Sequence, residues 1–211
     1  MACPAASLWD TAATLSGVSC DSAFALDSCS PPLFERLGTN GAAEAVLWRL
    51  STLFYERVFA DTEPLPSGSL LRHAFASTTK TEAAANQARH CCSACACPSC
   101  SLSTQSAYLV ERLGGPKLYT QRKGSTSLIG RHAPYAGVTH EAAVRWLHHM
   151  DAALLGVPEI DEEARAMLQA FFAFHAAYIV EGRLLLNPAR LIGYGGSVHV
   201  ASAHGGRQTQ L

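Results

Sequence analysis

Helical spacing of apolar residues is the feature that most constrains what this chain can fold into. One stripe, in the segment 41–60, consists of Val46, Leu50, Leu53, Phe54 and Val58. A second stripe, in the segment that begins at Thr139, consists of Ala143, Trp146, Leu147, Met150 and Leu154. Each stripe covers one face of a helix, and no run of alternating apolar and polar residues supports a sheet. The sequence therefore predicts an all-α protein.

Caps and helix breakers indicate where the helices begin and end. Gly38, Gly114-Gly115-Pro116 and Gly156-Val157-Pro158 stop helices, whereas Thr139 and Asp161 are suited to begin them. We expect helical segments at 33–38, 41–60, 70–75, 80–87, 106–113, after Thr139 and after Asp161.

Composition divides the chain into a main domain and two extensions. Residues 1–32 are rich in Ala, Ser, Cys and Pro, and we expect a flexible, loosely held N-terminal arm with a short helix within 14–26. The main domain is expected at 33–182. The Gly-rich segment 183–211 is expected to be a disordered tail.

Charge and hydropathy exclude two classes of partner. Lys and Arg number 16 against 17 Asp and Glu, so the chain has no basic excess that would favour nucleic acid. No apolar run approaches the roughly 20 residues that cross a bilayer. Because the first basic residue is Arg36, the start fits neither a signal peptide nor a transit peptide. We expect a cytoplasmic protein, with the chloroplast as the weaker alternative.

Cysteines gather in the segment 88–105, which has no periodicity and is expected to be a loop. Their clustering argues against a disulfide framework and fits a reducing compartment. Two Cys-x-x-Cys pairs between Cys92 and Cys100 imitate a zinc site. Only Ala96 separates the pairs, so little chain is available to wrap a tetrahedron.

One histidine has a setting that is suited to a ligand. His132 lies two residues before Pro134, so the local helix must end there. A histidine beside such a break, facing apolar helices, is either structural or an axial ligand of iron. Ligation requires a neutral ring whose other nitrogen donates to a backbone carbonyl. His175, among several aromatic residues, is read as a packed core histidine.

The motifs around His132 resemble a known family. The matching segments are 118–124, 128–132, 138–143 and 145–147, with 54–58 upstream and 15–18 and 23–27 in the arm. In order and spacing they resemble the group II truncated haemoglobins of plants and green algae. The similarity ends near Gly182. It implies the truncated globin fold, a two-over-two helical sandwich around haem b.

The resemblance also implies roles for individual residues. His132 becomes the proximal iron ligand, and Tyr55 and Trp146 become hydrogen-bond donors to a ligand on the distal side. The remaining implied haem-pocket residues are Phe75 on the haem face, Gln87 and the small Ala83 on the distal helix, and Arg131 at a propionate. Gln105 is an alternative to Gln87, because the family runs from Gln87 directly into the segment that here begins at Ser106. Arg131 reads equally well as a solvated arginine.

The implied function is reversible binding of oxygen, nitric oxide or carbon monoxide at the haem iron. Nitric oxide dioxygenation would additionally need a reductase. The alternatives are a haem-dependent redox enzyme, peroxidase-like or nitrite-reducing, and a haem-free helical interaction module. The last alternative depends on the segment 88–105, which interrupts the distal helix. Its abrupt change of composition suggests the hypothesis of a retained intron or a gene-model error.

Overall fold

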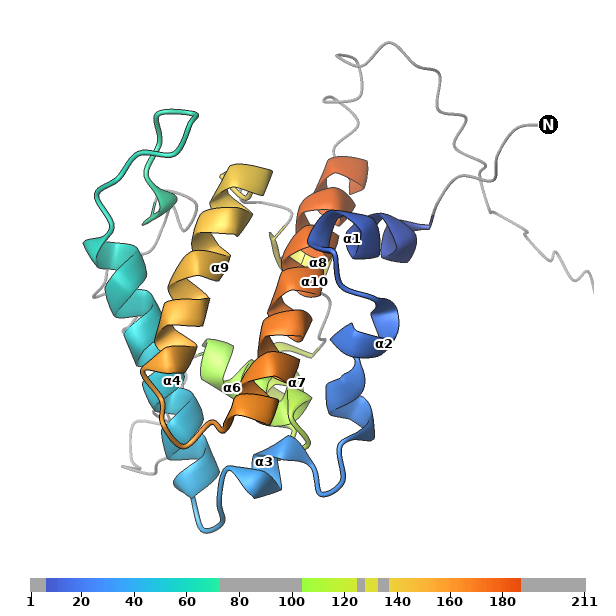
Figure 1. Ribbon diagram of the computed structural model, residues 1–211, viewed down its shortest axis with the longest axis vertical. Helices are drawn as coiled ribbons and strands as arrows, with labels where there is room; N and C mark the ends of the chain where they lie inside the picture. Colours follow the sequence, from blue (N-terminus) through green and yellow to red (C-terminus); the bar gives the residue numbers. More distant parts are fainter. Residues whose placement is uncertain (1–6, 73–103, 125–127, 133–136, 187–211) are drawn as a thin grey trace, which may run out of the picture.

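The computed structural model describes residues 7–72, 104–124, 128–132 and 137–186, and these residues are helical with short connections (Figure 1). Its three long helices are α4 (Ala42–Ala60), α9 (His140–Leu155) and α10 (Glu162–Leu186). Shorter helices are α3 (Leu33–Arg36), α6 (Thr104–Arg112), α7 (Leu118–Lys123) and α8 (Leu128–His132). Across these ranges the structure has no strand beyond an isolated bridge between Pro64 and Leu70. The predicted all-α class is confirmed.

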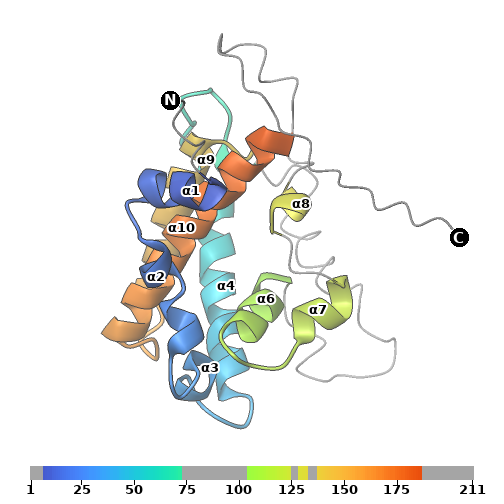
Figure 2. The same cartoon turned by 90° about the vertical axis from the view of Figure 1, so that its right-hand side faces the viewer.

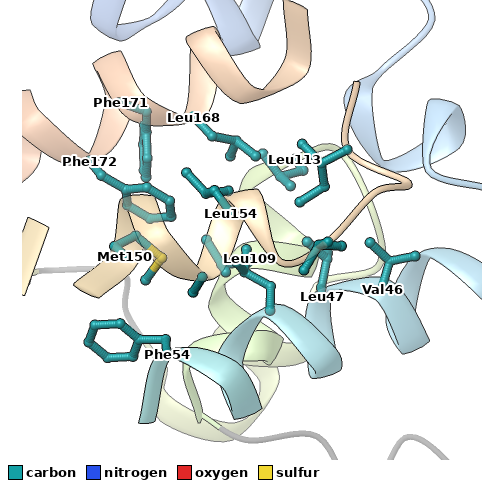
Figure 3. Close-up of a cluster of buried hydrophobic side chains, with 14 of the residues drawn as sticks. Val46, Leu47, Phe54, Leu109, Leu113, Met150, Leu154, Leu168, Phe171 and Phe172 are labelled. Atoms are coloured by element: carbon teal, nitrogen blue, oxygen red, sulfur yellow. The ribbon is translucent and has the colours of Figure 1, made fainter. Parts of the chain in front are cut away.

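The core lies where α4, α6, α9 and α10 meet (Figure 3). Its largest fully buried side chains include Leu47, Leu50, Phe54, Leu109, Met150, Leu154 and Phe171. Full burial of an apolar side chain of this size contributes roughly 1.5–3 kcal/mol. Both predicted stripes face this core, with Leu53, Trp146 and Leu147 packed at its margin, except that Ala142 rather than the predicted Ala143 is the buried alanine of α9. The helical spacing in the sequence therefore located the core correctly.

The predicted caps of the two last helices are confirmed. The hydroxyl oxygen of Thr139 accepts from the backbone N–H of Ala142 at 3.3 Å, at the start of α9. The carboxylate of Asp161 accepts from the backbone N–H of Ala164 at 2.8 Å, at the start of α10. Each bond satisfies a backbone donor that has no partner within its helix.

The prediction of a flexible, loosely held arm over residues 1–32 is wrong for the part that the structure describes. The arm folds into α1 (Leu8–Ser16), α2 (Cys20–Ala23) and the 3-10 helix η1 (Ala25–Ser28), which pack against α10 (Figure 2). Ala12 and Ala23 are fully buried there. Small residues do not prevent packing but allow two helix backbones to approach closely. A capping box between Ser7 and Asp10 also stabilises the first turn of α1.

Three predicted boundaries differ from the structure. Helix α10 continues through Gly182 to Leu186, so the tail does not begin at 183. Helix α6 already begins at Thr104, so the loop predicted to end at Gln105 ends earlier. Of the helical piece predicted at 70–75, the structure describes a bridge at Leu70 and a short 3-10 turn after it. The predicted helix at 80–87, the cysteine pairs and residues 187–211 lie outside the described residues.

No helix within the described ranges is long and apolar enough to cross a membrane. Those ranges also contain no cluster of three or more His, Cys, Asp or Glu side chains that could hold a metal ion.

Replacing Ala12 by Leu should force α1 away from α10, because the added methyl groups have no space at a fully buried contact. We expect a loss of about 1–3 kcal/mol in the free energy of unfolding. Backbone amides of residues 8–16 should also exchange hydrogen faster. Thr14→Leu is the matched control, because Thr14 is exposed on the same helix. Equal effects of the two substitutions would contradict the packing described for α1.

Candidate functional site

His132 is the last residue of α8 and is half-buried. Its Nδ1 lies 2.7 Å from the carbonyl oxygen of Leu128, one turn earlier. A carbonyl can only accept, so Nδ1 carries the proton and Nε2 keeps its lone pair. Burial lowers the pKa of His132, and the nearby charge of Arg183 lowers it further, while the bond to Leu128 acts in the opposite direction. The imidazole is therefore neutral and oriented at neutral pH.

A close helix contact positions α8 on α10. Gly182 lies inside α10 and is buried, and Ile129 packs onto it. A Cβ at Gly182 would lie 2.2 Å from Cδ1 and 2.6 Å from Cγ1 of Ile129. Only glycine leaves room for this side chain. Next to it, the buried guanidinium of Arg183 donates to the carbonyl of Val138, just before α9. Together these contacts join α8, α10 and the start of α9 around His132.

The structure brings Tyr55 and Trp146 together on one wall of the core. Both rings pack on the fully buried Phe54, with ring centroids 5.1 Å away for Tyr55 and 5.0 Å away for Trp146. Trp146 also meets Phe172 edge-on at 5.5 Å. Both side chains are half-buried. Two hydrogen-bond donors, a phenol and an indole, are therefore held by the same apolar ring.

Charged residues hold α4 and α9 in register beside this pair of rings. The carboxylate of Asp61, just after α4, lies 2.7 Å from Nε2 of His149 and 3.0 Å from Nε of Arg145. Burial alone raises the pKa of Asp61, but hydrogen bonds from His149 and from the Glu63 backbone, with the charge of Arg145, lower it below its usual value. The carboxylate thus remains charged and links the end of α4 to α9.

Most of the other predicted pocket residues lie outside the part of the chain that the structure describes. Phe75, Ala83 and Gln87 lie outside the described residues, and so does the side chain of Arg131. Gln105, the alternative to Gln87, lies in the first turn of α6. Its Oε1 is buried, and among the described residues no hydrogen bond reaches that atom. The structure therefore places His132, Tyr55 and Trp146 and leaves the distal helix unplaced.

The sequence did not predict two features that position the helices around the site. Gly182 was read as the end of the main domain, although its environment is that of a close helix contact. The Asp61 network had a weak signal, because Arg145 and His149 are four residues apart on one helix face and Asp61 directly follows a long helix. Without the fold, the sequence does not show that Ile129 packs on Gly182 or that Asp61 pairs with Arg145 and His149.

Comparison with known proteins identifies the family. The chain matches the model of the bacterial-like globin family over residues 99–178. It is 38% identical over 181 residues to two-on-two hemoglobin-3 of Arabidopsis thaliana, covering 86% of each chain. The chain belongs to the group 2 truncated haemoglobins. It is also 38% identical over 181 residues to group 2 truncated hemoglobin 3-1 of Lotus japonicus, covering 86% of this chain and 89% of that one.

A solved hemoglobin from Chloroflexus aurantiacus is 28% identical, with a TM-score of 0.47, over 71% of this chain and 97% of that one. The resemblance inferred from the motifs is thus confirmed through the plant relatives, and with it the truncated globin fold. For a group 2 truncated haemoglobin, membership of the globin family implies a haem cofactor and haem-based ligand binding.

Replacing Gly182 by Ala should disturb the haemoglobin at α8. An exposed helical glycine usually gains about 0.5–1 kcal/mol from this change, but here the new methyl group meets Ile129. We expect a loss of about 1–3 kcal/mol in the free energy of unfolding, measured by chemical denaturation.

A second variant tests the cause of that loss. Gly182→Ala combined with Ile129→Ala should be less destabilised than the sum of the two single variants, because shortening Ile129 removes the clash. Strictly additive effects would show that the contact between these two residues does not limit the approach of α8 to α10.

Proposed function

We propose that this chain holds a b-type haem through Nε2 of His132 and binds a diatomic ligand reversibly on the opposite side. The observation that carries the proposal is the 2.7 Å bond from Nδ1 of His132 to the Leu128 carbonyl. It provides the tautomer and orientation that an imidazole needs as a metal ligand. When bound, the haem supplies an iron atom that takes up oxygen, nitric oxide or carbon monoxide.

His175 is the natural competitor for this role, because its Nδ1 also bonds a carbonyl four residues earlier, that of Phe171 at 2.8 Å. The ring of His175, however, is packed among Phe24, Phe171, Phe174 and Tyr178. Within the described part of the chain no aromatic ring packs on His132. The family motif also falls on His132, so the two observations favour the same residue.

On the distal side we propose Tyr55 and Trp146 as donors to the bound ligand. Phe54 packs on both rings, and each ring is half-buried at the margin of the apolar core. Each neutral hydrogen bond contributes roughly 0.5–1.5 kcal/mol net. By carry-over from the family, Phe75 packs on the haem, Gln87 or Gln105 faces the ligand beside Ala83, and Arg131 meets a propionate.

Hydrogen-bond donors at this position slow the release of the bound ligand. Slow release favours chemistry on the ligand over bulk oxygen delivery. Nitric oxide dioxygenation, with a separate reductase, is the reaction that we propose first. Peroxidase-like and nitrite-reducing activities at the same site are the alternative enzymatic functions. A haem-free helical module is the alternative that loss of haem binding would support.

Titration of the purified full-length chain with haem tests the proposal. The wild type should develop the Soret band of a histidine-ligated haem protein, and His132→Ala should lose it. The matched control is His175→Ala, which removes a half-buried histidine with the same type of backbone bond and should keep the band. An unchanged spectrum for His132→Ala would overturn the assignment, and a wild type without a Soret band would support the haem-free module.

Replacing Tyr55 by Phe should accelerate oxygen release, because the ring still packs on Phe54 but the hydroxyl donor is gone. One neutral hydrogen bond corresponds to a rise of about two- to tenfold in the dissociation rate. Stopped-flow measurement of oxygen dissociation checks this value. Tyr178→Phe on α10 is the control and should leave the rate unchanged. A Tyr55→Phe rate equal to that of the wild type would remove Tyr55 from the distal site.

A further inference from the structure

The outer face of α9 carries apolar side chains that no described element covers. Helix α9 lies between α4 and α10 and packs on both through its buried residues (Figure 1). On its outer face, Val144 and Leu155 are 69% and 68% exposed, the highest fractions among the large apolar side chains that the structure describes. A single exposed apolar residue needs no explanation, but two on the same face of one helix mark a candidate interface.

The spacing along this outer face is typical of a helix that packs against a second helix. Val144, His148, Asp151 and Leu155 follow one another at intervals of four, three and four residues. Such intervals form the seam of a coiled coil, in which each side chain fits between side chains of the facing helix. His148 is exposed and Asp151 is half-buried, and within the described ranges neither side chain forms an ion pair. The seam therefore has apolar ends and an unpaired basic and acidic group in its centre.

The order of the four seam residues makes the face complementary to itself in one orientation. When two copies of α9 lie antiparallel, with a twofold axis between His148 and Asp151, Val144 of one copy faces Leu155 of the other. His148 of one copy then faces Asp151 of the other, and each contact occurs twice, as a twofold interface requires. In a parallel pair each residue would face its own copy, and the two Asp151 carboxylates would repel each other. Charge therefore selects the antiparallel pair.

We propose that two copies of this chain form a dimer through the outer faces of their α9 helices, which lie antiparallel. The contacts between Val144 and Leu155 bury apolar surface at both ends of the seam. A histidine ring can donate to a carboxylate whether it is neutral or charged, so the central pairs of His148 and Asp151 fix the direction and the register. None of these four residues is proposed to contact haem or its ligand, so the inference does not rest on the proposed function.

The size of the contact predicts a weak and reversible dimer. Helix α9 has 16 residues, which corresponds to a strip about 24 Å long and roughly 10 Å wide. Stable interfaces usually bury about 800 Å² on each partner, and smaller ones belong to transient complexes. We therefore expect monomer and dimer to exchange rapidly and the dimer to dominate only in concentrated samples.

Sedimentation velocity of the full-length, haem-loaded protein over a concentration series tests the proposal. The average sedimentation coefficient should rise with concentration from the value of a monomer towards that of a dimer. Val144→Asp and Leu155→Asp should each weaken association by about tenfold or more, because each places two unpaired charges in the contact. Leu185→Asp on α10 is the matched control, since Leu185 is 62% exposed and lies outside the seam. It should leave the association constant unchanged.

An exchange of the two central residues tests the orientation. His148→Asp alone brings carboxylates of the two copies together and should weaken association by about tenfold. Adding Asp151→His places a histidine opposite each carboxylate in the antiparallel pair and should recover most of the wild-type association constant. In a parallel pair the exchanged groups would still face their own kind, and the second substitution would bring no recovery.

Three results would overturn the proposal. They are a wild type that stays monomeric at every concentration, Val144→Asp and Leu155→Asp variants that associate as strongly as the wild type, and a doubly exchanged variant no tighter than His148→Asp. The Soret absorbance of the same samples reports haem binding separately. A chain that dimerises as expected but binds no haem would retain this interface and lose the proposed function.

Discussion

Packing around Phe54 is the constraint on which the rest of the structure depends. This side chain is fully buried where α4 meets α9, so it belongs to the hydrophobic core. The same ring orients Tyr55 and Trp146, the two donors proposed for the distal side. The stability of the core and the proposed ligand contacts therefore depend on the same side chain. The Asp61 network closes the same interface from outside and limits sliding of one helix along the other.

Local features could be predicted from the sequence because they depend on short-range spacing. The stripes on α4 and α9 and the caps at Thr139 and Asp161 follow from helical periodicity and from backbone hydrogen bonding, which are decided within a few residues. The bond from His132 to a carbonyl was also foreseeable, since a helical histidine near a helix end finds a carbonyl one turn back. The role proposed for this residue came from the family motif.

Features that depend on contacts between distant segments could not be predicted in this way. Gly182 precedes a Gly-rich segment and was read as a domain end, and only the approach of Ile129 shows that its missing side chain makes room for a neighbour. Likewise Ala12 and Ala23 suggest a weakly structured arm until α10 is beside them. In both cases the small size of the residue is the informative property, and the spacing of large apolar residues along the sequence does not report it.

The small contact residues of the arm have a consequence for motion. Ala12 buries little apolar area, and Trp9 of α1 remains partly exposed while it stacks on Phe174 and Tyr178 of α10. Detaching α1 breaks these contacts but none of those around Phe54, so it falls among the local opening events that precede global unfolding. The core around Phe54 and the approach of α8 to α10 at Gly182 do not involve α1, so both can stay closed while the arm opens.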